Sequence, residues 1–184
     1  EWSRQTNYQI NAMVDALDIR LREVLREDLG GTYGVGVNAD LSRFPDQEYA
    51  LSVSFGCDPN RVDELVEAVF QELETLKTTP LEESYITRVK QTKLRTYETN
   101  LEENSYWLSA LRSAYYHNQD PVEDILNYPE LVETTSAEMI RQIAQTYFNM
   151  DNYAKFVLYP EDDTATTEQA EYSTRMTQIY TDFL

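Results

Sequence analysis

Residues 21–37 read LREVLREDLGGTYGVGV and contain the end of an amphipathic helix, a double-glycine break and a strand. Apolar residues recur at close to helical spacing between positions 8 and 29, which predicts the helix. Gly30 and Gly31 end it, because glycine adopts the left-handed cap conformation at little cost. The alternation over residues 33–38 is typical of a strand. The break therefore separates Arg26 from Tyr33, which lie seven positions apart.

The next 40 or so residues predict a second strand and a helix. Alternation resumes over residues 49–56 after a polar loop at 40–48, which indicates an antiparallel neighbour for the first strand. Asp58 and Pro59 then provide a capping side chain and a proline suited to the first helical position. The helix that follows has the strongest apolar stripe in the chain, made of Val62, Leu65, Val66, Val69, Phe70, Leu73 and Leu76.

The remainder is predicted to be mainly helical. Thr79 with Glu82, and Thr135 with Glu138, have the spacing of capping boxes, so each pair predicts a helix start. Helices are expected over residues 80–101, 105–117 and from 135 onward, with a turn at 121–127. The apolar segment 153–159 predicts a third strand. Residues 162–167 are expected to form a polar linker and 168–184 a last helix.

Three strands among five or more helices predict an α+β fold, with helices packed on one face of an antiparallel sheet. A three-stranded sheet is small for so many helices to pack against. We therefore expect that further strands of this sheet precede residue 1 and are missing from this chain. Residues 1–184 would then be a single, N-terminally truncated domain of a longer protein. An edge left unpaired in this way invites self-association with another copy.

Composition restricts the partners. Fifteen basic and 33 acidic residues give a net charge of −18, and a field of that sign repels phosphate backbones, which argues against nucleic-acid binding. The chain contains no apolar run near the ~20 residues of a membrane span. Its one cysteine, Cys57, cannot form an internal disulfide.

The common catalytic patterns are missing from the sequence. His117 is the only histidine, and neither HxxEH nor HExxH occurs, whereas a catalytic zinc usually has three protein ligands. We interpret His117 as a surface residue at a helix end and Cys57 as an inert thiol. There is no GxSxG elbow. The glycines at 30–36 follow a helix and open a strand, the reverse of a dinucleotide-binding fingerprint.

Arg26 and Tyr33 remain as candidates, although each has an ordinary explanation. A cation in the last turn of a helix is favoured by the helix dipole, and aromatic residues are common in strands. The functional alternative is that the guanidinium and the phenol stabilise the negative charge that develops on a scissile carbonyl oxygen during peptide hydrolysis.

The order of a helix, LREDLGGTYGVGV, a strand and a helix entered by Asp58-Pro59 resembles the C-terminal domains of pitrilysin/insulinase-type zinc peptidases, the inverzincins. The Arg26/Tyr33 spacing is the specific part of the resemblance. It implies a metallopeptidase domain of the pitrilysin/processing-peptidase type in which Arg26 and Tyr33 contact the bound peptide or its transition state. It also implies that the zinc is held by N-terminal catalytic domains of the same polypeptide.

Two functions are compatible with this resemblance. In the first, the chain forms part of the enclosing chamber of a zinc metalloendopeptidase and is inactive alone, because it lacks the inverted zinc motif. In the second, it belongs to a non-catalytic scaffold or processing-complex subunit of the same fold. An unrelated acidic α+β interaction module is a third possibility. Bacterial relatives of this kind are often exported, so the resemblance favours the periplasm over the cytoplasm.

Overall fold

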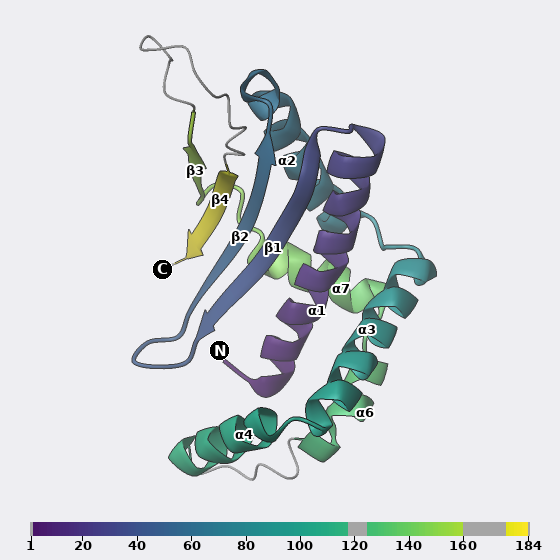
Figure 1. Ribbon diagram of the computed structural model, residues 1–184, viewed down its shortest axis with the longest axis vertical. Helices are drawn as coiled ribbons and strands as arrows, with labels where there is room; N and C mark the ends of the chain where they lie inside the picture. The colour runs from purple at the N-terminus through teal and green to yellow at the C-terminus, as the bar shows by residue number, and fades with distance from the viewer. Residues whose placement is uncertain (1, 118–124, 160–175, 184) are drawn as a thin grey trace, which may run out of the picture.

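The computed structural model describes residues 2–117, 125–159 and 176–183 (Figure 1). Its elements run in the order α1 (Arg4–Leu21), η1 (Arg22–Asp28), β1 (Thr32–Ser42), β2 (Glu48–Cys57), η2 (Pro59–Arg61), α2 (Val62–Thr78), α3 (Glu83–Leu101), α4 (Asn104–His117), α6 (Tyr128–Glu133), α7 (Ala137–Tyr147), β3 (Ala154–Val157) and β4 (Met176–Phe183). The predicted α+β class is confirmed.

The sheet is antiparallel and its described strands have the order β1-β2-β4-β3. The predicted pairing of the first two strands is confirmed, with Val35 opposite Phe55 and Val37 opposite Val53. The strand expected over residues 153–159 is also present, as the shorter β3. Within the described sheet β1 has a partner on one side only.

The prediction of a terminal helix over residues 168–184 is wrong for residues 176–183, which form strand β4 between β2 and β3. The segment MTQIYTDF contains threonine, isoleucine and aromatic residues that suit a strand. Its position between two other strands supplies backbone partners on both sides, which a helical periodicity could not reveal. Residues 160–175, which include the predicted linker, lie outside the described residues.

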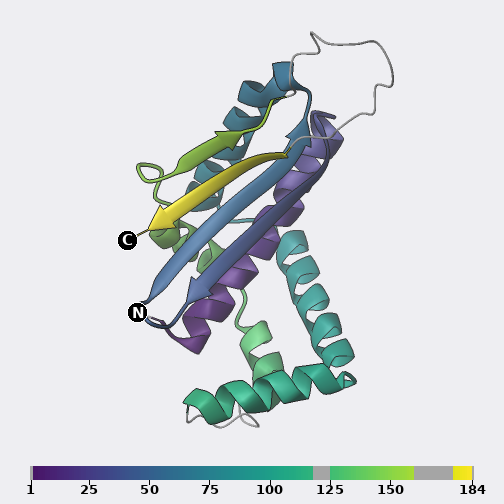
Figure 2. The same cartoon turned by 60° about the vertical axis from the view of Figure 1, so that its left-hand side comes forward.

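The core lies between the sheet and the helices α1, α2 and α7, which cover one of its faces (Figure 2). Six of the seven residues in the predicted α2 stripe are buried. Leu65 and Val69 of that stripe pack in the same core as Met13 of α1, Phe55 of β2 and Ile140 of α7. Burying side chains of this size contributes about 1.5–3 kcal/mol each, so this layer supplies most of the support for the sheet.

Helices α3, α4 and α6 form a second group beside α1, with α4 lying across the lower end of the molecule (Figures 1 and 2). Both predicted capping boxes are wrong, by three residues at α3 and by one residue at α7. Helix α3 has Glu82 as its N-cap, and α7 has Ser136, whose hydroxyl accepts a hydrogen bond from the Met139 amide at 3.1 Å. Thr135 is buried instead, 2.5 Å from the Tyr8 hydroxyl, because a tertiary contact competes with the local cap.

Candidate functional site

The turn between α1 and β1 is built by an irregular helix end. The helix expected to run through position 29 changes at Arg22 into the π-helix η1, in which the Leu29 amide donates to the Val24 carbonyl at 3.0 Å. The Gly31 amide then donates to the Leu25 carbonyl at 2.8 Å. Gly30 has φ +55°, which confirms the predicted glycine cap. Single π turns are frequent at functional sites.

Helix α2 holds this turn from one side. A Cβ atom on Gly31 would lie 2.4 Å from one methyl carbon of Leu65, so only glycine fits there. Arg61 donates hydrogen bonds to the carbonyl oxygens of Leu29 at 3.2 Å and Gly30 at 3.4 Å. Glu64 orients the Arg61 guanidinium through two further bonds of 2.9 and 2.7 Å. The carbonyl groups of Leu29 and Gly30 are therefore satisfied by Arg61, which ends η2 and precedes α2.

A β-bulge determines the direction of Tyr33. The register between β1 and β2 shifts between Thr32 and Val35. The Thr32 hydroxyl lies 2.8 Å from the Gly34 carbonyl and 3.2 Å from the Gly34 amide. Thr32 and Val35 are buried, whereas the Tyr33 side chain is 93% exposed. The sequence alternation groups Tyr33 with Val35, and the bulge separates them, since a bulge re-aims the side chains next to it.

Arg26 is exposed in the last turn of η1, before the glycine turn. Its neighbour Leu25 is fully buried and anchors η1 in the core. Among the described residues the Arg26 guanidinium makes no hydrogen bond, ion pair or ring contact, and nothing there joins it directly to Tyr33. Both predicted side chains are thus exposed to solvent, and no described contact brings them together.

A polar network connects η1 with the helices α1, α2 and α3. Arg20 of α1 binds both carboxylate oxygens of Glu72 on α2 at 2.9–3.1 Å and donates to the Tyr85 hydroxyl at 2.9 Å. Tyr85 of α3 donates to Glu23 of η1, and Arg88 donates to the other oxygen of Glu23, each at 2.5 Å. These partners lie 52–65 positions apart in the chain, so no local pattern could have revealed the network.

The network changes the ionisation of its members. Partial burial disfavours the charged form of Glu23, but hydrogen bonds from Tyr85 and Arg88 outweigh it and hold the pKa of this carboxyl below its ordinary value. Burial, together with the bond to the Glu23 carboxylate, raises the pKa of the Tyr85 hydroxyl. Glu23 is therefore an ionised carboxylate at neutral pH, with Tyr85 as a neutral donor.

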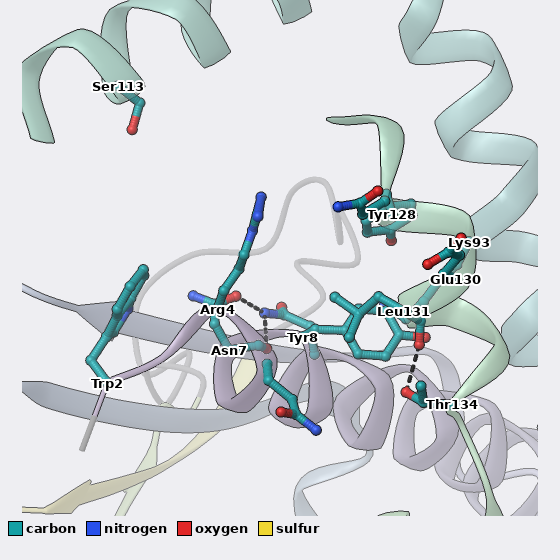
Figure 3. Close-up of a pocket in the computed structure, with 13 residues that line it drawn as sticks. Trp2, Arg4, Asn7, Tyr8, Lys93, Ser113, Tyr128, Glu130, Leu131 and Thr134 are labelled. Atoms are coloured by element: carbon teal, nitrogen blue, oxygen red, sulfur yellow. Dashed lines mark hydrogen bonds between the residues drawn. The ribbon is translucent and has the colours of Figure 1, made fainter. Parts of the chain in front are cut away.

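A large cavity lies elsewhere in the described structure. It measures about 910 Å³ and opens between the N-terminal half of α1 and the helices α3, α4 and α6 (Figure 3). Buried Lys93 on its wall forms an ion pair with Asp15 at 2.7 Å, and Tyr8 packs edge-on against Tyr128 at 5.9 Å between ring centres. Neither Arg26 nor Tyr33 lines it.

The described residues do not suit a zinc ion. No three side chains among the described His, Cys, Asp and Glu residues form a group that could hold a metal. His117 ends α4 and is half-buried, with its ring stacked on Phe44 at 5.1 Å between centres. Cys57 lies at the end of β2 and is not part of a disulfide. Any zinc that serves this domain must therefore use ligands outside the described residues.

Comparison with known proteins identifies the class. Residues 3–93 match the model of the peptidase M16 inactive domain. The chain is 27% identical over 151 residues to a protein named probable zinc protease PqqL from Haemophilus influenzae, an alignment that covers 78% of this chain and 15% of that protein. The chain is thus homologous to PqqL-like zinc proteases of the pitrilysin/insulinase (M16) family, and its N-terminal half matches the inactive domain of that family.

Solved structures share the fold. The periplasmic protease PqqL of Escherichia coli superposes with a TM-score of 0.64 at 19% identity, covering 79% of this chain and 16% of that one. The ferredoxin protease FusC, solved with Arabidopsis ferredoxin, also gives 0.64, at 22% identity and with coverage of 80% and 16%. The chain spans about one sixth of the length of these two proteins. No helix in the described part of the chain has the length and apolar character needed to cross a bilayer.

Proposed function

We propose that this chain is a C-terminal domain of a zinc metalloendopeptidase and that it supplies Arg26 and Tyr33 to a composite active site. The zinc and its ligands belong to an N-terminal catalytic domain of the same polypeptide, and the isolated chain is inactive. The observation that carries the proposal is the exposure of both side chains at the two ends of one turn, whose carbonyl groups at Leu29 and Gly30 accept hydrogen bonds from Arg61. The match to the peptidase M16 inactive domain and the homology to a probable zinc protease support the same function.

The proposed role of Arg26 and Tyr33 in peptide hydrolysis follows from the hydrogen-bond donors that they carry. Attack on a peptide bond places negative charge on the carbonyl oxygen, and a zinc ion, when bound, supplies the polarisation and the activated water for that step. The Arg26 guanidinium and the Tyr33 hydroxyl are hydrogen-bond donors that would contact the peptide backbone or the developing oxyanion. Because the turn is already ordered, no reorganisation is needed when the charge develops. The domain also forms part of the wall of the enclosing chamber.

Two further properties follow from this proposal. The acidic surface, with a net charge of −18, would attract cationic peptides at low ionic strength. We also propose export to the periplasm, which is where the E. coli protease PqqL is described. Cell fractionation tests this directly, and recovery of the longer polypeptide in the cytoplasm would contradict it.

The free side of β1 suggests that the chain self-associates. Strand β1 extends over 11 residues and lies at one edge of the described sheet. Unpaired backbone groups along such an edge can pair with a second copy. Sedimentation of the isolated chain at high concentration tests this, and a single monomeric species would contradict it.

The site itself is tested by Arg26→Ala and Tyr33→Phe in the longer polypeptide, with kcat/KM measured on a peptide. Loss of one such donor lowers the rate by about 10²–10³, and the melting temperature should stay nearly constant because both side chains are exposed. Arg112→Ala and Tyr115→Phe are matched controls, since both residues are exposed on α4. Unchanged kinetics in both site variants would refute the assignment. A longer polypeptide with no peptidase activity and no HxxEH motif would instead support the scaffold.

A further inference from the structure

The cavity beside α1 is lined mainly by uncharged side chains. Its volume of about 910 Å³ is within the size range of ligand pockets. The chain has 33 acidic residues, yet Glu130 is the only acidic one among the described residues on the cavity wall. Of the two cations there, Arg4 is exposed and buried Lys93 is already paired with Asp15 at 2.7 Å. An uncharged polar ligand therefore suits this cavity better than an ion.

Several polar groups on the wall have unused hydrogen-bonding capacity. The Asn11 side-chain nitrogen donates to the backbone oxygen and the side-chain oxygen of Asn7, at 2.8 and 2.9 Å. The Asn7 NH2 group and the Asn11 side-chain oxygen form no hydrogen bond among the described residues. The same is true there of the Tyr128 hydroxyl and of the Asn127 side chain, which lies at the N-cap of α6 without capping it. These donors and acceptors are available to a ligand.

Aromatic rings that other residues hold in place lie toward both ends of the cavity (Figure 3). At one end, the Arg43 guanidinium stacks on the Trp2 ring at 4.4 Å from its centre, and Gln47 accepts a hydrogen bond from the Trp2 amide at 2.7 Å. At the other end, Tyr128 packs edge-on against Tyr8. Because these contacts exist before a ligand arrives, little ordering of the wall is needed on binding, which favours affinity.

We propose that this cavity binds a short, extended and uncharged segment of a peptide chain. Asn7 and Asn11 present a donor and an acceptor side by side, which complements the C=O and N–H groups of a peptide main chain. Residues 4–11 of α1 rise by about 10 Å along the helix, so they match about three residues of extended chain. The inference rests on the proposed function for the identity of the ligand, because a domain of a peptidase meets peptide chains.

A carbohydrate is the other uncharged ligand that amide and aromatic side chains bind. Three probes separate the two classes: a blocked hexapeptide of alanine and serine, the same hexapeptide with an N-methylated main chain, and cellohexaose. N-methylation removes the main-chain N–H donors and leaves the side chains unchanged. A site that recognises the peptide main chain therefore distinguishes the two hexapeptides.

The first measurement is an NMR titration of the isolated chain. It follows the side-chain NH2 groups of Asn7 and Asn127 and the indole N–H group of Trp2. The unmodified hexapeptide should shift these signals to saturation, and the N-methylated hexapeptide should bind about two- to tenfold more weakly, as expected for the loss of one hydrogen bond. The inference is overturned if no signal shifts to saturation, if both hexapeptides bind equally, or if only cellohexaose binds.

Variants of the wall locate the binding site. Asn127→Ala and Tyr128→Phe each remove a group that has no hydrogen bond in the described structure, so the fold should be kept while hexapeptide affinity falls about two- to tenfold. Gln91→Ala and Tyr116→Phe are the matched controls, because they alter exposed side chains that do not line the cavity. Equal loss of affinity in the controls would overturn the assignment to this cavity.

The second measurement uses the longer polypeptide. Asn127→Ala should raise KM for a peptide about two- to tenfold and leave kcat unchanged, because the lost contact is remote from the reacting bond. An unchanged KM would overturn a role for the cavity in holding substrate. The proposed function fails separately: in that case Arg26→Ala and Tyr33→Phe have normal kinetics, while the isolated chain still binds the hexapeptide.

Discussion

Replacing Gly31 by alanine tests how the α1–β1 turn is packed. The added methyl carbon would lie 2.4 and 2.8 Å from the two methyl carbons of Leu65, whereas carbon atoms are most stable about 3.5–4.0 Å apart. Leu65 is fully buried in α2 and has no solvent-filled space to move into. Such overpacking costs about 1–3 kcal/mol. With a typical urea m-value of about 2 kcal/mol/M, the unfolding midpoint of Gly31→Ala should fall by roughly 0.5–1.5 M.

A double-mutant cycle tests whether contact with Leu65 causes the loss of stability in Gly31→Ala. Leu65→Ala removes the atoms that clash and should itself cost about 2–5 kcal/mol, since it leaves a cavity. In Gly31→Ala/Leu65→Ala the new methyl group occupies part of that cavity, so the double variant should be about 1–3 kcal/mol more stable than the sum of the single effects predicts. The assay is urea unfolding followed by circular dichroism.

Gly34→Ala is the matched control. No heavy atom lies within 4 Å of a Cβ built at Gly34, and its φ is not in the positive range. Its unfolding free energy should stay within about 0.5 kcal/mol of the wild type. The packing argument is refuted if Gly31→Ala is as stable as Gly34→Ala, or if the effects of Gly31→Ala and Leu65→Ala are simply additive.

Two further predictions concern the bulge and the Tyr8–Tyr128 cluster. Thr32→Val removes the hydroxyl that contacts the Gly34 amide and carbonyl and should lower the unfolding free energy by about 0.5–1.5 kcal/mol. Thr32→Ser keeps the hydroxyl and should therefore keep these contacts. Equal unfolding free energies for the two variants would contradict the role of the hydroxyl. Burial raises the pKa of Tyr128 to about 12, so the folded chain keeps a proton that the unfolded chain releases near pH 10. This stabilisation is complete below pH 10 and is lost as the pH rises toward 12. The melting temperature should therefore fall less steeply with pH over that range in Tyr128→Phe than in the wild type. Tyr116→Phe alters an exposed ring and should behave like the wild type. Identical slopes of melting temperature against pH in all three proteins would contradict the assignment of this stabilisation to Tyr128.

Local patterns predicted much of the fold. The α2 stripe is buried almost as its 3.6-residue spacing indicates, and the glycine pair ends its helix with a positive φ at Gly30. The first two strands pair as their alternation predicts. These signals are reliable because the residues that produce them are close in sequence, so the physics of one helix turn or one hairpin is sufficient.

Predictions failed where a distant segment decided the outcome. Thr135 is of a residue type that often caps helices, but its hydroxyl forms a hydrogen bond with Tyr8, which is 127 positions away. Residues 176–183 form a strand because β2 and β3 supply backbone partners on both sides. A local pattern contains no information about such partners, so neither result could be read from it.

The candidate site depends on both kinds of information. Arg26, Tyr33 and the glycine break between them are encoded in 17 consecutive residues, and their spacing alone indicates the family resemblance. The tertiary structure decided how these side chains are presented: the bulge turns Tyr33 outward, Leu65 admits only glycine at position 31, and α3 occupies Glu23. The reason is that a side chain's direction and freedom depend on the groups packed around it, and those groups come from helices and strands far away in the chain.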